Sequence, residues 1–480
     1  MKLGLVAHGY PPELVGGTEN NVQALARALS GLGHDVFVIA GSMDYADGWR
    51  RSLVEDRDPI SGNTLRVHRI HRADLYFDHW HKSASPAAGQ LFEEILREES
   101  PDVINVHHWI RLSRDLVTRA ARLGIPSVVT LHDLWTTCLV AFRIRPDTQD
   151  FCDAPLAPDP CGDCASKVGP ATPWVQVAET MSRVAEFKLD MSRELELAAL
   201  IVVPCEVHAK ATARFLATDL VFGNVHVLPP ARTPHPLSVR RVSEPKGEFT
   251  KDEPLVLAYF GKWSVLKGTD LLLEALSLTR EPERFRLLIA GDSPTPEHDG
   301  RLRAFVKSEL PAGVVTFFGP YDHSRLSQHE LSAAHLFVTG TRAHESFGLV
   351  VDEALELGMG CLLPNLGALG ERGARVEWAT VFESGDARDL ARTLDQHADD
   401  PARVSALRDA AISAVRDGDF TARAPSLEVL AHKMEELLEK AIAGGLPALP
   451  LAKMRAIDWP TREVRLQDQN DAWDHTVSGL

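Results

Sequence analysis

The chain has 480 residues, which at roughly 150 residues per domain suits two large domains or about three ordinary ones. Charged residues make up 25% and hydrophobic residues 44% of the chain, which excludes the disordered and fibrous classes and is typical of a globular protein. The net charge of −16 argues against nucleic acid as a main partner, because binding to a phosphate backbone depends on clustered cations.

The sequence shows no export signal and no membrane-spanning segment. Its N-terminal apolar run is only about five residues long, and a Pro pair follows where a signal peptide would continue. No stretch approaches the roughly 18 uninterrupted apolar residues that a spanning helix needs. We therefore expect a cytoplasmic protein, for which peripheral contact with a membrane face stays open.

Short apolar runs alternate with helix-length segments over the first 230 residues. Residues 3–7 predict a strand, and an amphipathic helix follows with Val22, Leu25, Ala26, Leu29 and Leu32 on one stripe. Such alternation predicts a parallel sheet covered on both faces, and we place an N-terminal domain at residues 1–230. Further strands are expected at residues 35–40, 65–70, 103–106, 127–131, 200–203 and 225–228.

A Pro-rich, charged stretch from Pro229 to Pro254 interrupts this pattern and predicts a linker at residues 231–254. A second domain is expected at residues 255–420, and a helix and tail at residues 421–480 are expected to pack back on the first domain. The fold class is α/β, with two doubly wound, Rossmann-like parallel-sheet domains facing a cleft. Strands of the second domain are expected at residues 255–260, 286–290, 314–318, 336–339, 361–363 and 380–382.

The most informative stretch runs from Gly340 to Gly360 and reads GTRAHESFGLVVDEALELGMG. It follows a predicted strand and opens a helix near Phe347 or Gly348. Glu345 on the loop and Glu353 on the helix can face one ligand, and the free N–H groups of Gly348 and Leu349 suit an anion. The same residues also fit an ordinary strand-to-helix turn with solvated glutamates.

A second stretch, YFGKWSVLKGTDLLLEAL, begins at Tyr259 and places Lys262 and Lys267 in the loop that precedes a helix. Two ammonium groups beside a helix N-terminus suit a pyrophosphate. The alternative is a pair of surface lysines, which is the usual place of lysine. The position of the pair after the first strand of the second sheet favours the binding site.

A third stretch, HGYPPELVGGTE, begins at His8 and lies where a dinucleotide-binding fold would carry GxGxxG. That spacing is absent, which counts against a nicotinamide enzyme. Gly16 and Gly17 precede a helix whose N-cap we expect to be Thr18, so that their amides could touch a phosphate.

With these three stretches together, the chain resembles the retaining glycosyltransferases of family 4, which have the GT-B fold. The resemblance covers residues 1 to about 440. It rests on the segments GGTE, GHDV, FGKWSVLKG, LLIAGDS, VTFFGPY, HESFGLVVDEAL and GMGCLLPNLGALGE, of which the one with the glutamate pair is the most diagnostic.

The resemblance implies roles for the matching residues. Glu345 would support the oxocarbenium charge that develops on the donor sugar, and His132 would lie near the reacting sugar. Lys267 and Lys262 would neutralise the leaving diphosphate; the family usually has Arg at the second position, and an ammonium lacks the fork of a guanidinium. The other donor-binding residues implied are Gly17, Ser346, Phe347, Gly348, Leu349 and, at the ribose hydroxyls, Glu353.

The resemblance also implies the reaction. A sugar would pass from a UDP- or GDP-sugar to the hydroxyl of a glycan, a lipid-linked molecule or a small molecule, as in glycan or glycoconjugate biosynthesis. Retention would come from same-face attack in which the leaving phosphate helps to deprotonate the acceptor, and no cofactor or catalytic metal is expected. The alternatives are a nucleotide-sugar epimerase or hydrolase of the same fold, or a non-catalytic protein that binds nucleotide sugars.

Four of the six cysteines fall in an insert at about residues 135–175, which has many prolines and little periodicity. Four thiolates could bind a structural zinc ion, although only the last two have the two-residue spacing of such sites. Unligated thiols or a redox disulfide are the alternatives. The four are Cys138, Cys152, Cys161 and Cys164.

Positive charge is concentrated in the N-terminal domain, which binds the acceptor in the GT-B fold. The charge belongs either to a solvated face or to a site for an anionic or lipid-linked acceptor. The residues are Arg50, Arg51, Arg57, Arg66, Arg69, Arg72 and Lys82.

Overall fold

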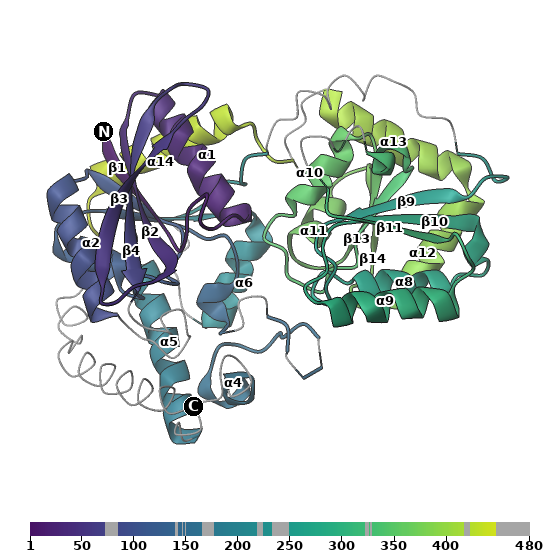
Figure 1. The fold of residues 1–480 in the computed structure, drawn as a ribbon, viewed down its shortest axis with the longest axis horizontal. Coiled ribbons are helices and arrows are strands. Elements are labelled where there is room, and N and C mark those ends of the chain that lie inside the picture. Colours follow the sequence, from purple (N-terminus) through teal and green to yellow (C-terminus); the bar gives the residue numbers. More distant parts are fainter. Residues whose placement is uncertain are drawn as a thin grey trace. The chain divides into compact units, whose positions relative to one another are not determined.

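The structure is a computed structural model of the chain. It describes residues 1–72, 85–139, 143–145, 147–148, 150–165, 177–217, 224–232, 249–321, 326, 329–416 and 423–447. These residues form two compact units (Figure 1). Unit 1 takes its described residues from Met1–Ala141, Asp153–Ala231 and Leu427–Leu480, and unit 2 takes its described residues from Phe142–Cys152 and Arg232–Ser426.

Unit 1 contains an eight-stranded sheet with the order β3-β4-β2-β1-β5-β6-β7-β8. All neighbouring strands run parallel except β3, which pairs antiparallel with β4 at the edge of the sheet. The strands are β1 (Lys2–Ala7), β2 (Asp35–Tyr45), β3 (Arg50–Arg57), β4 (Thr64–Arg72), β5 (Val103–Val106), β6 (Ser127–Thr130), β7 (Leu200–Val203) and β8 (Val225–Val227).

The predicted strands of the first domain are confirmed, and β3 is an additional strand. Its sequence, RRSLVEDR, is mostly exposed and carries no apolar alternation. An edge strand of this kind takes its conformation from pairing with its neighbour, so the hydrophobic pattern gives no sign of it. Its charged side chains also suit an unpaired sheet edge.

Helices cover both faces of this sheet. The predicted stripe on α1 is confirmed, because Val22, Leu25, Ala26 and Leu29 are buried against β1 and β2. The C-terminal helix α14 lies alongside α1 and completes the same core (Figure 1). The helices of unit 1 are α1 (Gly17–Gly31), α2 (Pro86–Glu99), α3 (Leu116–Arg122), η1 (Trp135–Thr137), α4 (Pro158–Ala165), α5 (Val177–Leu197), α6 (Glu206–Leu216) and α14 (Leu427–Gly444).

Unit 2 contains a six-stranded parallel sheet with the order β11-β10-β9-β12-β13-β14. This is the doubly wound order in which the direction of winding reverses once, here between β9 and β12. The predicted strands of the second domain are confirmed. They are β9 (Leu255–Phe260), β10 (Phe285–Ala290), β11 (Val315–Gly319), β12 (Leu336–Val338), β13 (Gly360–Pro364) and β14 (Ala379–Phe382).

The core of unit 2 has one apolar cluster on each face of the sheet. Side chains of α8, α9, α12 and α13 contribute to one cluster, and those of α10, α11 and α13 contribute to the other. The helices are α8 (Thr269–Ser277), η3 (Pro282–Arg284), α9 (Pro296–Glu309), η5 (Glu330–Ala333), α10 (Leu349–Glu356), α11 (Gly367–Gly373), α12 (Ala387–Asp399) and α13 (Pro401–Arg416).

Several predictions fall outside the described residues. They include most of the linker, at residues 233–248, the tail at residues 448–480, and Lys82. Within the part of the chain that the structure describes, every helix is too short or too polar to cross a membrane.

Candidate functional site

The candidate site of unit 2 lies at the carboxyl ends of β9 and β12, where the winding of the sheet reverses. Two loops meet there, and their backbones touch at Gly268 and Gly340. Gly268 has a φ of +67°, and a Cβ at this position would overlap the carbonyl oxygen of Gly340. Glycine is therefore required where the loops cross. This crossing brings the lysine-bearing loop beside the glutamate-bearing loop.

Arg342 fastens the two loops together. Its guanidinium forms a two-pronged ion pair with Asp270, with distances of 2.8 and 2.9 Å. It also donates to the carbonyl oxygen of Val265 at 2.9 Å, while its backbone N–H donates to Leu266. Bidentate contacts of this kind fix an angle as well as a distance. The loop geometry is therefore set before any ligand binds.

Lys267 and Glu345 form the centre of the site. The Nζ of Lys267 lies 2.5 Å from Oε1 of Glu345, and the hydroxyl of Thr341 donates to the same oxygen at 3.2 Å. The two charged side chains keep 37% and 19% of their surface exposed. A ligand can therefore reach a cation and a carboxylate that are held side by side.

The start of α10 provides a second feature for an anion. Gly348 is the N-cap, in agreement with the predicted opening of the helix, and its φ is +78°. The first N–H groups of a helix have no partner within it and carry a partial positive charge. The acidic residue of this first turn, Asp352, is buried and bound to Arg372 at 2.8 Å. The carboxylate of the first turn is therefore engaged elsewhere, which leaves the helix start suited to an anion.

Arg372 holds this helix start in place, and the sequence interpretation missed it. Its Nη1 donates to the carbonyl oxygens of Phe347 and Gly348 at 2.9 and 3.0 Å, and its Cζ lies 4.3 Å from the centre of the Phe347 ring. The side chain is only 3% exposed. One available signal was the arginine in α11, whose sequence GALGERG is mostly small and apolar, but that run does not reveal its partners.

The remaining predicted donor residues of unit 2 surround this centre. Glu353 lies on α10 near Tyr321, where burial raises the pKa of the Tyr321 phenol and the Glu353 carboxylate raises it further. Lys262 is exposed, and its carbonyl oxygen accepts a 2.6 Å hydrogen bond from Tyr259. Ser346 and Leu349 are partly buried on either side of the buried Phe347 and the Gly348 N-cap.

Unit 1 carries a different cluster at the equivalent strand ends. His8 follows β1, His107 and His108 follow β5, and His132 follows β6. The Nδ1 of His107 lies 2.7 Å from Nε2 of His132, and the rings of His8 and His108 have centres 4.5 Å apart. Of these four histidines, the sequence indicated His132 alone, because nothing in the order of residues predicts that four imidazoles meet.

Three of these imidazoles, those of His107, His108 and His132, have pKa values that favour the neutral form. Burial lowers the pKa of His132 to about 4, with the neighbouring His108 and His8 acting in the same direction and Asp133 opposing them. Burial also lowers the pKa of His107 and of His108. A neutral imidazole offers one donor and one acceptor, so this cluster suits hydroxyl groups better than anions.

The N-terminus of α1 corrects one detail of the sequence interpretation. The N-cap is Gly16, and the helix begins at Gly17, so Thr18 lies inside the first turn and does not cap it. The carboxylate of Glu19 is 2.7 Å from Nε2 of His8 and accepts a hydrogen bond from its own backbone N–H. A carboxylate thus already interacts with this helix start. The assignment of Gly17 to the donor stays a prediction.

The four insert cysteines are divided between the two units. Cys152 belongs to unit 2, whereas Cys138, Cys161 and Cys164 belong to unit 1. Over the described residues, no group of three or more His, Cys, Asp or Glu side chains is placed to hold a metal ion. None of the cysteines is joined in a disulfide. The zinc hypothesis therefore gains no support here.

Three of the predicted cationic residues of unit 1 are neutralised by acids. Arg51 pairs with Glu98, and Arg69 pairs with Glu13. Arg66 pairs with Glu99 at 3.0 Å and with Asp35 at 2.8 Å. These contacts count against a site for an anionic acceptor at the three arginines, but Arg69 is buried and does not belong to a solvated face.

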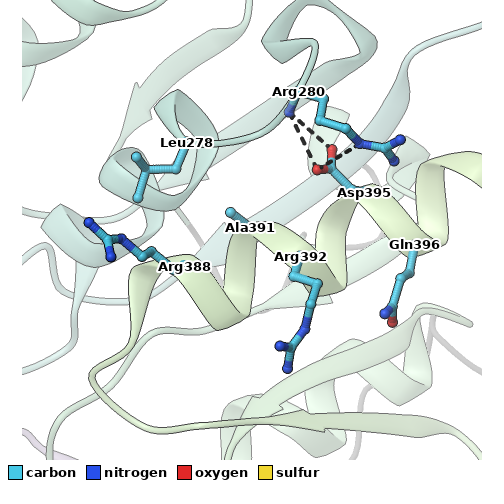
Figure 2. Close-up of a pocket in the computed structure, with 7 residues that line it drawn as sticks. All are labelled: Leu278, Arg280, Arg388, Ala391, Arg392, Asp395 and Gln396. Carbon is cyan, nitrogen blue, oxygen red and sulfur yellow. Dashed lines mark hydrogen bonds and ion pairs between the residues drawn. The ribbon is translucent and has the colours of Figure 1, made fainter.

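A shallow pocket of about 500 Å³ lies elsewhere on unit 2 (Figure 2). It lies between the end of α8 and α12, whereas the candidate site adjoins the start of α8. Asp395 accepts hydrogen bonds there from the backbone N and the Nε of Arg280. Arg388 also lines this pocket, so its positive charge belongs to the pocket and not to the candidate site. The pocket residues are Leu278, Arg280, Arg388, Ala391, Arg392, Asp395 and Gln396.

Two family models match the chain. The model described as Glycosyltransferase Family 4 matches residues 15–156, and the one described as Glycosyl transferases group 1 matches residues 241–417. Among curated relatives, glycogen synthase of Mycobacterium tuberculosis is 25% identical over 425 residues, covering 84% of this chain and 87% of that protein. D-inositol 3-phosphate glycosyltransferase of Jonesia denitrificans is 26% identical over 371 residues, covering 74% and 76%.

Solved structures show the same fold. Sucrose-phosphate synthase from Thermosynechococcus elongatus aligns with a TM-score of 0.61 at 20% identity, covering 92% of this chain and 100% of that one. Anabaena HepE in complex with UDP aligns with a TM-score of 0.56 at 15% identity, covering 92% and 100%. The two parallel-sheet units and both family models agree on one conclusion. The chain belongs to the family 4 glycosyltransferases, which are enzymes of the GT-B fold.

Proposed function

We propose that the enzyme transfers a sugar from a nucleoside-diphosphate sugar to a hydroxyl acceptor with retention of the anomeric configuration. The observation that carries this proposal is the pair of Lys267 and Glu345, 2.5 Å apart, at strand ends beside the start of α10. A cation and free amides suit a diphosphate, and a carboxylate beside them suits a sugar that becomes positively charged. The solved complexes of Anabaena HepE with UDP and with UDP-glucose support a donor of this class.

The chemical step breaks the bond between the anomeric carbon and the diphosphate oxygen. The bonding electrons leave with the phosphate, so negative charge grows where Lys267 and the amides of α10 lie. Glu345, freed from part of its contact with Lys267, stabilises the positive charge on the sugar ring. The acceptor oxygen then bonds to the anomeric carbon from the same face, and its proton passes to the departing phosphate oxygen. No separate carboxylate base is needed.

We assign the acceptor to unit 1. Its strand ends present His8, His107, His108 and His132. Burial lowers the pKa of His107, His108 and His132, so that these three imidazoles are neutral near pH 7. Neutral imidazoles can orient a hydroxyl by donating or accepting one hydrogen bond each. No cofactor takes part in this scheme.

A ligand panel tests the donor class. We expect one or more UDP-, GDP- or ADP-sugars to raise the melting temperature, because a ligand that binds only the folded state stabilises it by mass action. The selected donor, mixed with candidate acceptors, should release its nucleoside diphosphate, and proton NMR of the product should show the donor's anomeric configuration. Failure of every nucleotide and nucleotide sugar to shift melting contradicts the proposal.

Incubation of the donor alone separates the alternatives. A new sugar isomer formed without an acceptor would identify an epimerase, and free sugar formed at the full rate would identify a hydrolase. A non-catalytic binding protein would keep its role in the cell after Glu345→Ala, whereas a transferase would lose it.

A further inference from the structure

The short segment Phe142–Cys152 belongs to unit 2, although the chain on both sides of it belongs to unit 1. The Family 4 model covers this segment within its match to residues 15–156. The sequence alone therefore places it in the N-terminal part, as a section of the cysteine-bearing insert. Its packing shows that the insert contributes a piece of chain to the opposite unit.

The described residues of this segment form a small hairpin, which we call the insert hairpin (residues 143–152). Ile144 and Phe151 form an antiparallel bridge, and the N–H of Cys152 donates to the carbonyl oxygen of Arg143 at 2.6 Å. Arg143 has a φ of +55° and is 2% exposed. A left-handed conformation at a buried non-glycine residue persists only where surrounding contacts impose it. The shape of the hairpin is therefore imposed by what it contacts.

The insert hairpin packs on the residue that precedes Glu345. The ring of Phe151 stacks on that of His344, with centres 5.8 Å apart and planes 26° from parallel. The pKa of His344 is lowered by burial, and the positive charge of Arg143 lowers it further, which places the guanidinium near this imidazole. Both hairpin strands thus contribute a residue that acts on His344.

The backbone around His344 is held from a second element. Gly367 has a φ of +56°, and a Cβ there would lie 3.0 Å from both the carbonyl oxygen of Glu345 and the Nδ1 of His344. The N–H of Ala368 donates to the carbonyl oxygen of Glu345 at 3.1 Å. Because α11 holds the carbonyl group of Glu345, the contact of Phe151 with His344 is a second restraint on this segment of backbone.

We propose that the insert hairpin contributes to the donor-binding function of unit 2. In this proposal Phe151 is a positioning residue, which holds the backbone of His344 and Glu345 so that the Glu345 side chain stays beside Lys267. This inference rests on the proposed function, in which Glu345 stabilises the charged sugar. Stabilisation of a transient charge depends strongly on the position of the stabilising group. Loss of the stacked ring should therefore lower turnover more than donor binding.

Three variants of the full chain test this. Phe151→Ala removes the aromatic ring, whereas Phe151→Tyr keeps an aromatic ring that can stack on His344. Thr148→Ala changes an exposed residue of the hairpin turn and is the control. For each variant, kcat and the donor KM are measured, together with the melting temperature and hydrogen exchange of peptides that cover residues 340–348 and 366–373. Hydrogen exchange does not depend on activity.

We expect Phe151→Ala to lower kcat about three- to tenfold, the factor that corresponds to the strength of an aromatic pair, with the donor KM within about twofold of wild type. Exchange should become faster at the Ala368 amide and its neighbours, while Phe151→Tyr and Thr148→Ala match the wild type. The proposal is overturned if Phe151→Ala leaves both kcat and this exchange unchanged, or if melting falls and kcat is not rescued by Phe151→Tyr. A wild-type protein without transferase activity would instead refute the proposed function, and the exchange result would still stand.

Discussion

The two units place their clusters at the same topological position, and the clusters differ in charge. In each sheet the direction of winding reverses once, between β1 and β5 in unit 1 and between β9 and β12 in unit 2. Unit 2 presents an ammonium, a carboxylate and a helix start there. Unit 1 presents buried imidazoles with lowered pKa values. Topology thus places the two clusters at the same position, whereas local residues set their charge.

The N-termini of α1 and α10 illustrate this difference in charge. On α1, the first-turn Glu19 turns back to its own N-terminus and to His8. On α10, the first-turn Asp352 is turned inward, where it binds Arg372 and the N–H of Ala424. Since a carboxylate and a phosphate compete for the same amides, the start of α10 suits an anion better than the start of α1 does.

The largest effect on turnover is expected when the negative charge of Glu345 is removed from the candidate site. Glu345→Gln keeps the size of the side chain but loses its charge, so we expect kcat to fall about 100-fold, as for other preorganised electrostatic groups. Donor binding measured by calorimetry should change little. An unchanged kcat would show that the carboxylate does not stabilise the reacting sugar.

The second-largest effect is expected when the contacts that hold the start of α10 are removed. Arg372→Lys keeps the charge but loses the fork that reaches Phe347, Gly348 and Asp352, so we expect the free energy of unfolding to fall by about 2 kcal/mol. Urea denaturation measures this, and donor affinity should fall as well. Arg375→Lys, an exposed position just after α11, is the control. An unaltered donor affinity would show that Arg372 does not support the anion site.

The loss of one cation from unit 2 should weaken binding moderately. Lys267→Met should raise the dissociation constant of a nucleoside diphosphate about tenfold, since one charge-assisted contact is lost. Arg388→Met removes a positive charge from the pocket of Figure 2 and should leave the constant unchanged. Equal effects of the two variants would mean that only the net charge matters.

The smallest expected effect concerns unit 1 and is a change in how the free energy of unfolding depends on pH. The pKa of His132 is about 4 in the folded state and about 6.5 when exposed, so the unfolded state takes up a proton first as the pH falls. Stability should therefore decrease on acidification, with His132 accounting for about 1 kcal/mol between pH 7 and pH 5.5. Urea denaturation of His132→Asn should show a shallower pH dependence, and the exposed His432→Gln should not. Identical slopes for all three proteins would refute neutral burial of His132.

Much of this architecture could be predicted because the signals are local. Apolar runs located the strands of both sheets, and the glycine in HESFGLVV located the start of α10. The edge strand β3 was missed because its exposed residues carry no pattern. The cap of α1 was assigned to Thr18 on residue type, whereas the N-cap is Gly16, two residues earlier.

The sequence by itself determined the two doubly wound sheets, the family, and the residues Lys267 and Glu345, because periodicity and short motifs are properties of neighbouring residues. Only the tertiary structure decided which distant groups meet. It joined Lys267 to Glu345 through the contact of Gly268 with Gly340, and it placed Arg372 under Phe347. It also assembled four histidines from three strand ends and laid Phe151 of the insert on His344. Such contacts depend on chain crossings and burial, which no local pattern encodes.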